Sequence, residues 1–143
     1  MGEVLTTVRD KAEKLESALS KVPQIEVPLT HTIAGGMYAR TGTIPAGSIF
    51  TGAVHTRDHI NVIVGDVSFF DENGVTRING HNVIPCKAGA KRVALTHSTV
   101  VWTTLVKTDK TTVEEIENEL VEQPETLQSR RLPIGQSINK LEG

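Results

Sequence analysis

Two histidines and an aspartate lie within five residues of one another in the stretch GAVHTRDHINVIVGD. Imidazole nitrogens and carboxylate oxygens are the groups that proteins use to bind zinc, iron, manganese or nickel. On a β-strand His55 and His59 would point to the same face, and Asp58 would need a bulge or a turn to join them. The same pattern also suits the exposed polar start of a strand, with Asp58 paired to Arg57 or Lys91.

The segments around this stretch have the composition of β-strands. Between about residues 28 and 108, short runs rich in Thr, Val and Ile alternate with Gly, Pro and Asn. β-Branched residues favour a pleated sheet, and the DENG sequence at 71–74 predicts a tight type I′ hairpin. Closely spaced strands with no helix inside 55–105 predict an all-β fold, an antiparallel sandwich or barrel.

Helical patterns flank the strands on both sides. Thr112 with Glu115 three residues later is a capping box, which predicts a short helix over 112–122. Near the N-terminus apolar residues recur at steps of three and four, which predicts an amphipathic helix over 3–21; they are Val4, Val8, Ala12, Leu15, Leu19 and Val22. We therefore divide the chain into a helix (1–24), a β-barrel domain with its closing helix (25–122) and an arm or tail (123–143).

Composition narrows the class of protein. A formal net charge of −2 shows no excess of positive charge of the kind that binds nucleic acid. No run reaches the roughly 20 apolar residues that a membrane span needs. The charged N-terminus does not have the pattern of a signal peptide, so we expect a cytoplasmic protein. Cys86 is the one cysteine, which excludes an intramolecular disulfide. We interpret Cys86 as a buried inert thiol and Trp102 as a core residue.

The stretch IPAGSIFTGAVHTRDHINVIVGDVSFF, followed by HNVIPCKAGAKRV, resembles the cupin superfamily of small jelly rolls. Asp58 stands seven residues before Gly65, in the position of the glutamate of the first cupin motif. His55 lies close to the histidines of that motif, and His59 directly follows the acidic position. The resemblance implies an antiparallel β jelly roll with its site inside the barrel, and it makes His55 and His59 the expected metal ligands.

The second cupin motif, Pro-x-Gly-x-x-His, departs from the family pattern. Pro85 and Gly89 are one residue too far apart, and Arg92 stands where the family has a histidine. An arginine stays protonated and cannot ligate a metal. His97 could replace the missing ligand, but residues 92 and 97 face opposite sides of a regular strand. Arg92 pointing inward would give a cationic pocket for a carboxylate or phosphate, whereas His97 pointing inward would permit a metal.

More narrowly, the chain is similar to small cupin-like proteins of tailed bacteriophages. The shared features include Tyr-x-Arg, Ile-Pro-Ala-Gly, His-x-x-acid-His-x-Asn, Gly-x-Lys-Arg and Val-Trp-Thr-Thr segments and a short acidic helix. The resemblance implies a phage-encoded protein that acts in the host cytoplasm. We expect ligand-binding roles for Arg92, Asp58, Tyr38 and Arg40.

Three functions are compatible with this pattern. We favour a protein that binds a small molecule, an anion or a metal ion in the barrel. The second is a metal-dependent enzyme of the dioxygenase, isomerase or lyase type, with His55, His59 and a third ligand such as His97 around one divalent Zn, Fe, Mn or Ni ion. The third is a structural scaffold. The apolar stripe and the arm predict a homo-oligomer, with neither nucleic acid nor membrane as partner.

Overall fold

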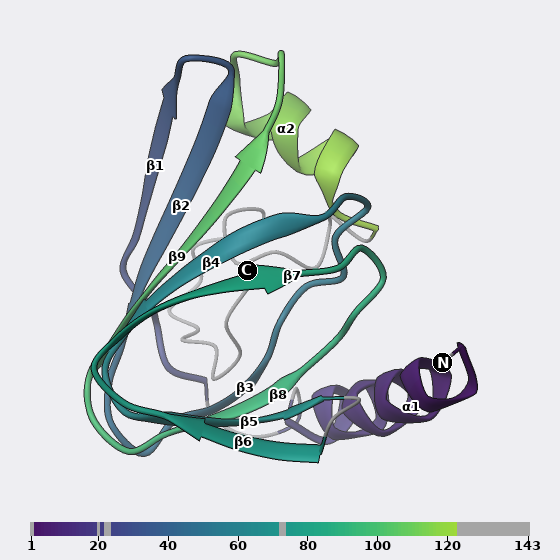
Figure 1. Ribbon diagram of the computed structural model, residues 1–143. Coiled ribbons are helices and arrows are strands. Elements are labelled where there is room, and N and C mark those ends of the chain that lie inside the picture. Colours follow the sequence, from purple (N-terminus) through teal and green to yellow (C-terminus); the bar gives the residue numbers. More distant parts are fainter. Residues whose placement is uncertain (1, 20, 22–23, 72–73, 123–143) are drawn as a thin grey trace.

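Two antiparallel β-sheets face each other in the computed structural model, and one helix lies beside each sheet (Figure 1). The structure describes residues 2–19, 21, 24–71 and 74–122. Every strand pairing within these residues is antiparallel, and the strands run from 29 to 107 with no described helix between them. The predicted all-β architecture is confirmed.

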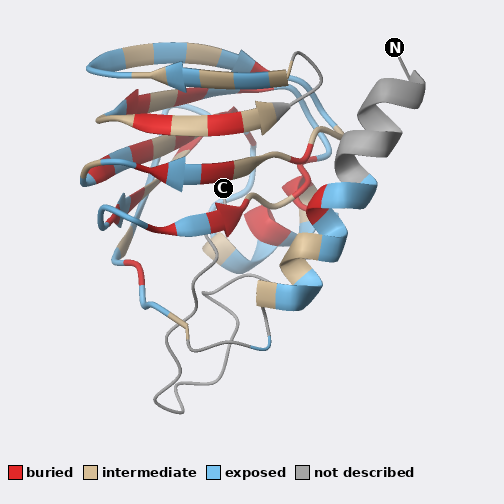
Figure 2. Ribbon diagram, turned by 90° about the horizontal axis from the view of Figure 1, so that it is seen from below, coloured by how far each residue is buried: buried red, intermediate tan, exposed pale blue. Residues whose placement is uncertain are grey.

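The larger sheet has five strands in the order β1-β2-β9-β4-β7. Buried and exposed residues alternate along β2, β9 and β4 (Figure 2), because successive side chains of a strand point to opposite faces. One face of the sheet therefore belongs to the interior. The bounds are Leu29–Ala34 (β1), Met37–Ile44 (β2), Val100–Lys107 (β9), His59–Val64 (β4) and His81–Cys86 (β7).

The smaller sheet has four strands in the order β3-β8-β5-β6. Its β5–β6 hairpin places Asp71 opposite Gly74, which confirms the hairpin predicted from DENG. The type of turn stays a prediction, because residues 72–73 lie outside the described residues. The bounds are Ile49–Thr51 (β3), Val93–Thr96 (β8), Val67–Asp71 (β5) and Gly74–Ile78 (β6).

Gly65, in the short connection between β4 and β5, is a position that needs a glycine. Its φ angle is +134°, and a Cβ atom there would come within 2.7 Å of the Thr99 carbonyl oxygen. The chain can therefore pass this closely under the start of β9 only without a side chain. The constraint explains the glycine that interrupts the apolar run VIVGDV.

The core between the sheets is mainly aliphatic, as the low aromatic content predicts. Ile44, Ile63, Val67 and Val100 are almost completely buried, and Phe50, Phe69 and Trp102 join them. Phe50 and Trp102 meet edge to face, with their ring centroids 5.7 Å apart. The prediction that Trp102 is a core residue is confirmed.

Helix α2 (Val113–Leu120) packs against one end of the larger sheet. The Thr112 hydroxyl accepts a hydrogen bond from the Glu115 backbone N–H at its start, as the capping box predicts. Ile116 and Leu120 are buried in a cluster with inward-facing residues of β2 and β9. The predicted helix and its apolar face are confirmed, and the helix covers this end of the barrel.

Helix α1 (Gly2–Leu19) packs against β3 and β5 of the smaller sheet (Figure 1). Ala12 of the predicted stripe is completely buried, whereas Leu15 and Leu19 are half-buried. The Glu16 carboxylate accepts hydrogen bonds from Lys91 Nζ at 2.9 Å and from the Thr51 hydroxyl at 2.7 Å. This half of the stripe therefore faces the chain's own barrel. The side chains of Val4, Val8 and Val22 lie outside the described part of the structure.

Lys91, which the sequence suggests as a partner of Asp58, is instead buried and ion-paired to Glu16. The burial comes from α1, which is distant in the sequence. The predicted arm (123–143) lies outside the described residues, so the three-part division of the chain stays a prediction. No described helix is both long and apolar enough to cross a lipid bilayer.

We expect the Lys91–Glu16 ion pair to stabilise the attachment of α1. Lys91→Met removes the ammonium group from a carboxylate that is only 20% exposed. The free energy of unfolding should fall by about 2 kcal/mol, as for other charged hydrogen bonds in sheltered surroundings. Urea denaturation measures the change. Lys110→Met is the matched control, because Lys110 Nζ lies 3.9 Å from an exposed Asp109 and such pairs contribute about 0.5 kcal/mol or less. Equal effects of the two substitutions would contradict the expectation.

Candidate functional site

His55 and His59 lie side by side at the end of the barrel that α2 covers. Their ring centroids are 4.1 Å apart, and both residues are buried. They do not share a strand, because β4 begins at His59 and His55 forms an isolated bridge with Val121. The chain bends between them at Thr56, whose backbone N–H and hydroxyl donate to carbonyls of the last turn of α2. A turn anchored to the helix, rather than strand alternation, brings the two imidazoles together.

Asp58 is exposed, whereas the two histidines are buried. Its carboxylate accepts a hydrogen bond from the Ala88 backbone N–H at 2.9 Å. The Gly89 backbone N–H donates to the His55 carbonyl oxygen, also at 2.9 Å. Asp58 and Gly89 thus fix the turn after β7 against the 52–58 loop. Of the two partners suggested for Asp58, Lys91 binds Glu16 and Arg57 binds Glu119.

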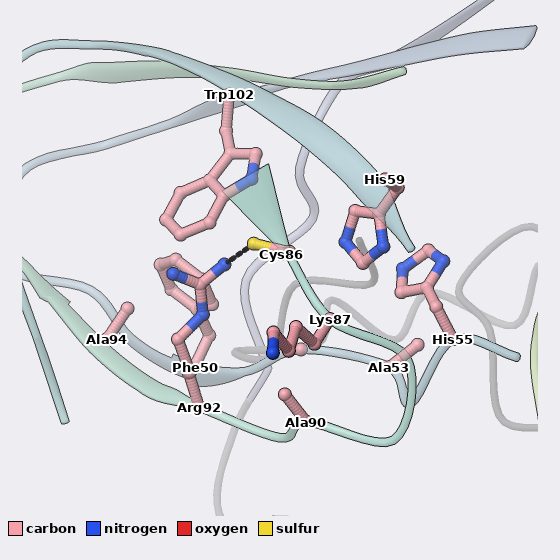
Figure 3. A pocket seen from close by; sticks show the side chains of 11 residues that line it. Phe50, Ala53, His55, His59, Cys86, Lys87, Ala90, Arg92, Ala94 and Trp102 are labelled. Atoms are coloured by element: carbon pink, nitrogen blue, oxygen red, sulfur yellow. Dashed lines mark hydrogen bonds between the residues drawn. The ribbon is translucent and has the colours of Figure 1, made fainter. Parts of the chain in front are cut away.

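Arg92, just before β8, points into the barrel between two aromatic rings. Its guanidinium carbon lies 5.0 Å from the Phe69 ring centroid and 5.8 Å from that of Trp102, within the range of cation–π attraction. One terminal N–H group donates to the Cys86 sulfur (Figure 3). The half-buried side chain therefore extends along apolar walls and carries its charge into the interior.

His97 takes the opposite face, as the period of a strand requires. It is exposed, and its Nε2 atom lies 2.8 Å from the Ser68 hydroxyl on the outer side of the smaller sheet. Arg92 and His97 are the two alternatives that the sequence leaves open, and the structure brings Arg92 to the histidine pair and leaves His97 outside.

Cys86 is the inward-facing end of β7 and is buried, as expected. Its sulfur accepts a hydrogen bond from Asn61 Nδ2 at 3.0 Å in addition to the one from Arg92. Asn61 Oδ1 in turn accepts from the Thr104 hydroxyl at 3.0 Å. These residues form a continuous polar chain across the inner face, from β9 through β4 and β7 to Arg92. A buried amide with both ends satisfied holds its neighbours in one arrangement.

These groups line a cavity at the barrel end (Figure 3). His55, His59, Cys86, Lys87, Arg92 and Trp102 line it, and small residues with Phe50 form the remaining wall. Water-sized molecules can place their centres in about 30 Å³ of this cavity. Since a single water needs about 10–15 Å³ by that measure, the cavity suits an ion, a few waters or a small polar molecule.

Trp102 is a cavity residue that sequence reasoning missed. Its side chain is buried, and its Nε1–H group has no hydrogen-bond partner among the described residues. Figure 3 shows the indole nitrogen on the ring edge that is turned toward Cys86 and His59. An unmade hydrogen bond of a buried donor costs about 1–3 kcal/mol. The apolar pattern VVWTTLV predicts a buried ring, but the direction of its N–H depends on the neighbouring strands.

His59 is held in a defined protonation state. Its Nδ1 atom lies 3.1 Å from the Arg57 carbonyl oxygen, and a carbonyl can only accept, so Nδ1 carries the hydrogen. Burial lowers the pKa of His59, the backbone hydrogen bond opposes this, and the charge of Arg92 lowers the pKa further. The ring is therefore neutral near pH 7, and Nε2 carries a lone pair.

Tyr38 and Arg40 lie on β2 and are both buried, but they do not line the cavity. The Tyr38 hydroxyl is 2.6 Å from His31 Nδ1, and the two rings stack with their centroids 5.9 Å apart. Burial raises the pKa of Tyr38 to about 12. The sequence places Tyr38 and Arg40 with the ligand-binding residues, whereas the structure places them in a neighbouring cluster near Glu117 of α2.

The described residues do not fit a complete metal site. None of their His, Cys, Asp and Glu side chains form a group of three that could hold a metal ion. His55 and His59 could supply two ligands, and a third would have to come from outside the described part of the chain. Arg92 adds a positive charge to the same cavity, which opposes a cation and favours an anion.

The sequence matches no protein-family model and no curated protein, but solved structures share its fold. A cupin superfamily protein from Desulfitobacterium hafniense aligns with a TM-score of 0.50 and 9% identity, over 62% of this chain and 84% of the other. A cupin domain from Bordetella pertussis aligns with a TM-score of 0.47 and 13% identity, over 61% and 98%. A double-stranded β-helix protein from Klebsiella pneumoniae gives 0.48 and 14%, over 66% and 84%. The fold is the cupin jelly roll, as the sequence resemblance implies.

We expect the folded protein to lose stability as the pH falls below about 6.5. The pKa of His59 is lowered in the folded state relative to its ordinary value near 6.5, so protons bind the unfolded chain more readily. The contribution of His59 to stability is then complete above that ordinary value and is lost as the pH falls through the folded-state value. Urea denaturation between pH 5 and 8 measures this, and His59→Gln should reduce the slope. An unchanged slope in the variant would contradict the assignment.

Proposed function

We propose that this cupin-fold protein binds a small anionic molecule through Arg92 in the cavity at the barrel end. The observation that carries the proposal is a guanidinium group that points into the barrel with no carboxylate within ion-pair distance among the described residues. A sheltered charge without a counter-charge is costly. A bound anion would supply the counter-charge, and the planar fork of arginine matches the two oxygens of a carboxylate.

The shape and lining of the cavity support a small ligand. The space suits a few non-hydrogen atoms, and Lys87 also lines it and adds a positive charge that favours an anion. His59 is neutral near pH 7 and contributes a hydrogen-bonding group rather than a further positive charge. A metal-dependent reaction would need a third ligand beyond the two histidines. The Tyr-x-Arg and His-x-x-acid-His-x-Asn segments support a phage-encoded protein acting in the host cytoplasm as part of this proposal.

Trp102, the one tryptophan of the chain, reports directly on the cavity. Acetate titrated into the protein should change its fluorescence, and bound acetate should slow alkylation of Cys86, the one cysteine. Arg92→Gln should weaken acetate binding about tenfold or more, because a charged hydrogen bond contributes about 1.5–3 kcal/mol. Binding should persist in the presence of a metal chelator.

Arg77→Gln is the matched control for that experiment. Arg77 is exposed and pairs with Asp66 outside the barrel, so its removal should leave acetate affinity unchanged. Acetate binding that is equally strong in Arg92→Gln and wild type would overturn the proposal. Binding that disappears with the chelator would instead favour a metal held by His55 and His59.

We also propose that the protein forms a homo-oligomer through the outer face of the five-stranded sheet. Neither helix packs on this face, and its central positions carry no charge, so two copies can meet there without like-charge repulsion. Ile60, Val64 and Val83 are each more than 40% exposed. The residues at the centre of this outer face are Ala39, Thr41, Ile60, Val62, Val64, Val83, Val101, Thr103 and Leu105.

Light scattering tests this assembly. The wild-type chain should show a multiple of 15.5 kDa, and Val62→Arg, in the middle of the face, should shift the mass toward the monomer. Val75→Arg is the control, because Val75 is 74% exposed on β6 of the other sheet. A wild-type mass near 15.5 kDa at all protein concentrations would contradict the proposal.

A further inference from the structure

We infer that the anion also carries a neutral hydrogen-bond donor next to its charged group, so that the cavity selects a small 2-hydroxy carboxylate. This inference rests on the proposed function and makes the ligand class more specific. It follows from the number and type of polar atoms that face the cavity, and these atoms include an acceptor as well as donors.

The acceptor is Nε2 of His59. The Arg57 carbonyl oxygen fixes the ring hydrogen on Nδ1, so the lone pair of the neutral ring is on Nε2. Figure 3 shows one ring nitrogen of His59 on the side of Arg92 and Cys86. A plain carboxylate has only acceptor atoms. Its oxygen would meet the lone pair of Nε2, and two acceptors repel each other. A hydroxyl group would instead donate a hydrogen bond to Nε2.

The donors include the guanidinium of Arg92, the ammonium group of Lys87 and the indole N–H of Trp102. Arg92 gives one recorded hydrogen bond, to Cys86, and a guanidinium has five N–H donors. The Trp102 Nε1–H group has no partner among the described residues. One carboxylate oxygen can accept from Arg92 and the other from Trp102. The ligand then accepts a hydrogen bond from Trp102 Nε1–H, a buried donor that has no partner among the described residues.

The charges around His59 decide between a hydroxyl and an ammonium group. Arg92 and Lys87 both line the cavity with His59. The Asp58 carboxylate is exposed, binds the Ala88 N–H and does not line the cavity. An ammonium group at Nε2 would therefore share the cavity with two cationic side chains. A neutral hydroxyl avoids this repulsion, so the 2-hydroxy acid is favoured over the 2-amino acid of the same size.

Three two-carbon ligands test the inference on the unaltered chain. Glycolate has the hydroxyl, acetate lacks it, and glycine has an ammonium group in its place. Titration at pH 7 followed by Trp102 fluorescence should give a dissociation constant for glycolate about fivefold to tenfold lower than that for acetate, the effect of one hydrogen bond. Glycine should bind no more tightly than acetate. Equal affinity for glycolate and acetate, or tighter binding of glycine, would overturn the inference.

The variant His59→Leu tests whether His59 causes the preference for glycolate over acetate. Its dissociation constants for glycolate and acetate should become equal, whereas a preference for glycolate that survives in the folded variant would overturn the role of His59. Cooperative urea unfolding shows whether the variant is folded, and the wild-type ligand series decides the inference if it is not. Acetate and glycolate bound equally, with both weakened in Arg92→Gln, would leave the proposed function intact. No binding of any of the three ligands would overturn the function itself.

Discussion

The placement of the permanent positive charge of Arg92 at the inner wall of an aliphatic barrel is the constraint on which the site depends. A guanidinium cannot lose its proton to relieve the cost of burial. The structure supports Arg92 with the faces of Phe69 and Trp102 and with the Cys86 sulfur. Cys86 is itself held by Asn61, and Asn61 by Thr104. Four strands thus contribute to the position of a single side chain, and that side chain brings a permanent charge to the cavity.

The mouth of the cavity is built from loops that bind to one another through their backbones. The 52–58 loop donates to carbonyls at the end of α2, and the turn after β7 donates to the His55 carbonyl and to the Asp58 carboxylate. The 52–58 loop is therefore held by α2, and the turn after β7 is held by the 52–58 loop. Hydrogen bonds of this kind place imidazole rings more firmly than the short loops could do alone.

The two helices have different relations to the site. Helix α2 covers the end of the barrel and receives the 52–58 loop. Helix α1 lies on the outside of the smaller sheet and holds Lys91 through Glu16. Lys91 and Arg92 are consecutive residues that take opposite faces, so one points out to α1 and the next points into the cavity. The attachment of α1 and the position of the guanidinium are thereby coupled through the backbone of two residues.

The sequence by itself determined the features that depend on local pattern. The period of the strands gave the antiparallel sheets, DENG gave the β5–β6 hairpin, and Thr112 with Glu115 gave the start of α2. The same period placed residues 92 and 97 on opposite faces. These features follow from the preferences of neighbouring residues, and neighbours are fixed by the chain itself.

Only the tertiary structure decided how distant segments meet. The turn that brings His55 to His59 depends on carbonyls of α2, more than 60 residues later. Lys91 is buried because Glu16 reaches it from a helix 75 residues earlier. The indole N–H of Trp102 faces a cavity whose other walls come from β3, β4, β7, β8 and the loops beside them. A pattern along one chain records burial, but it does not record which group from elsewhere in the fold lies opposite.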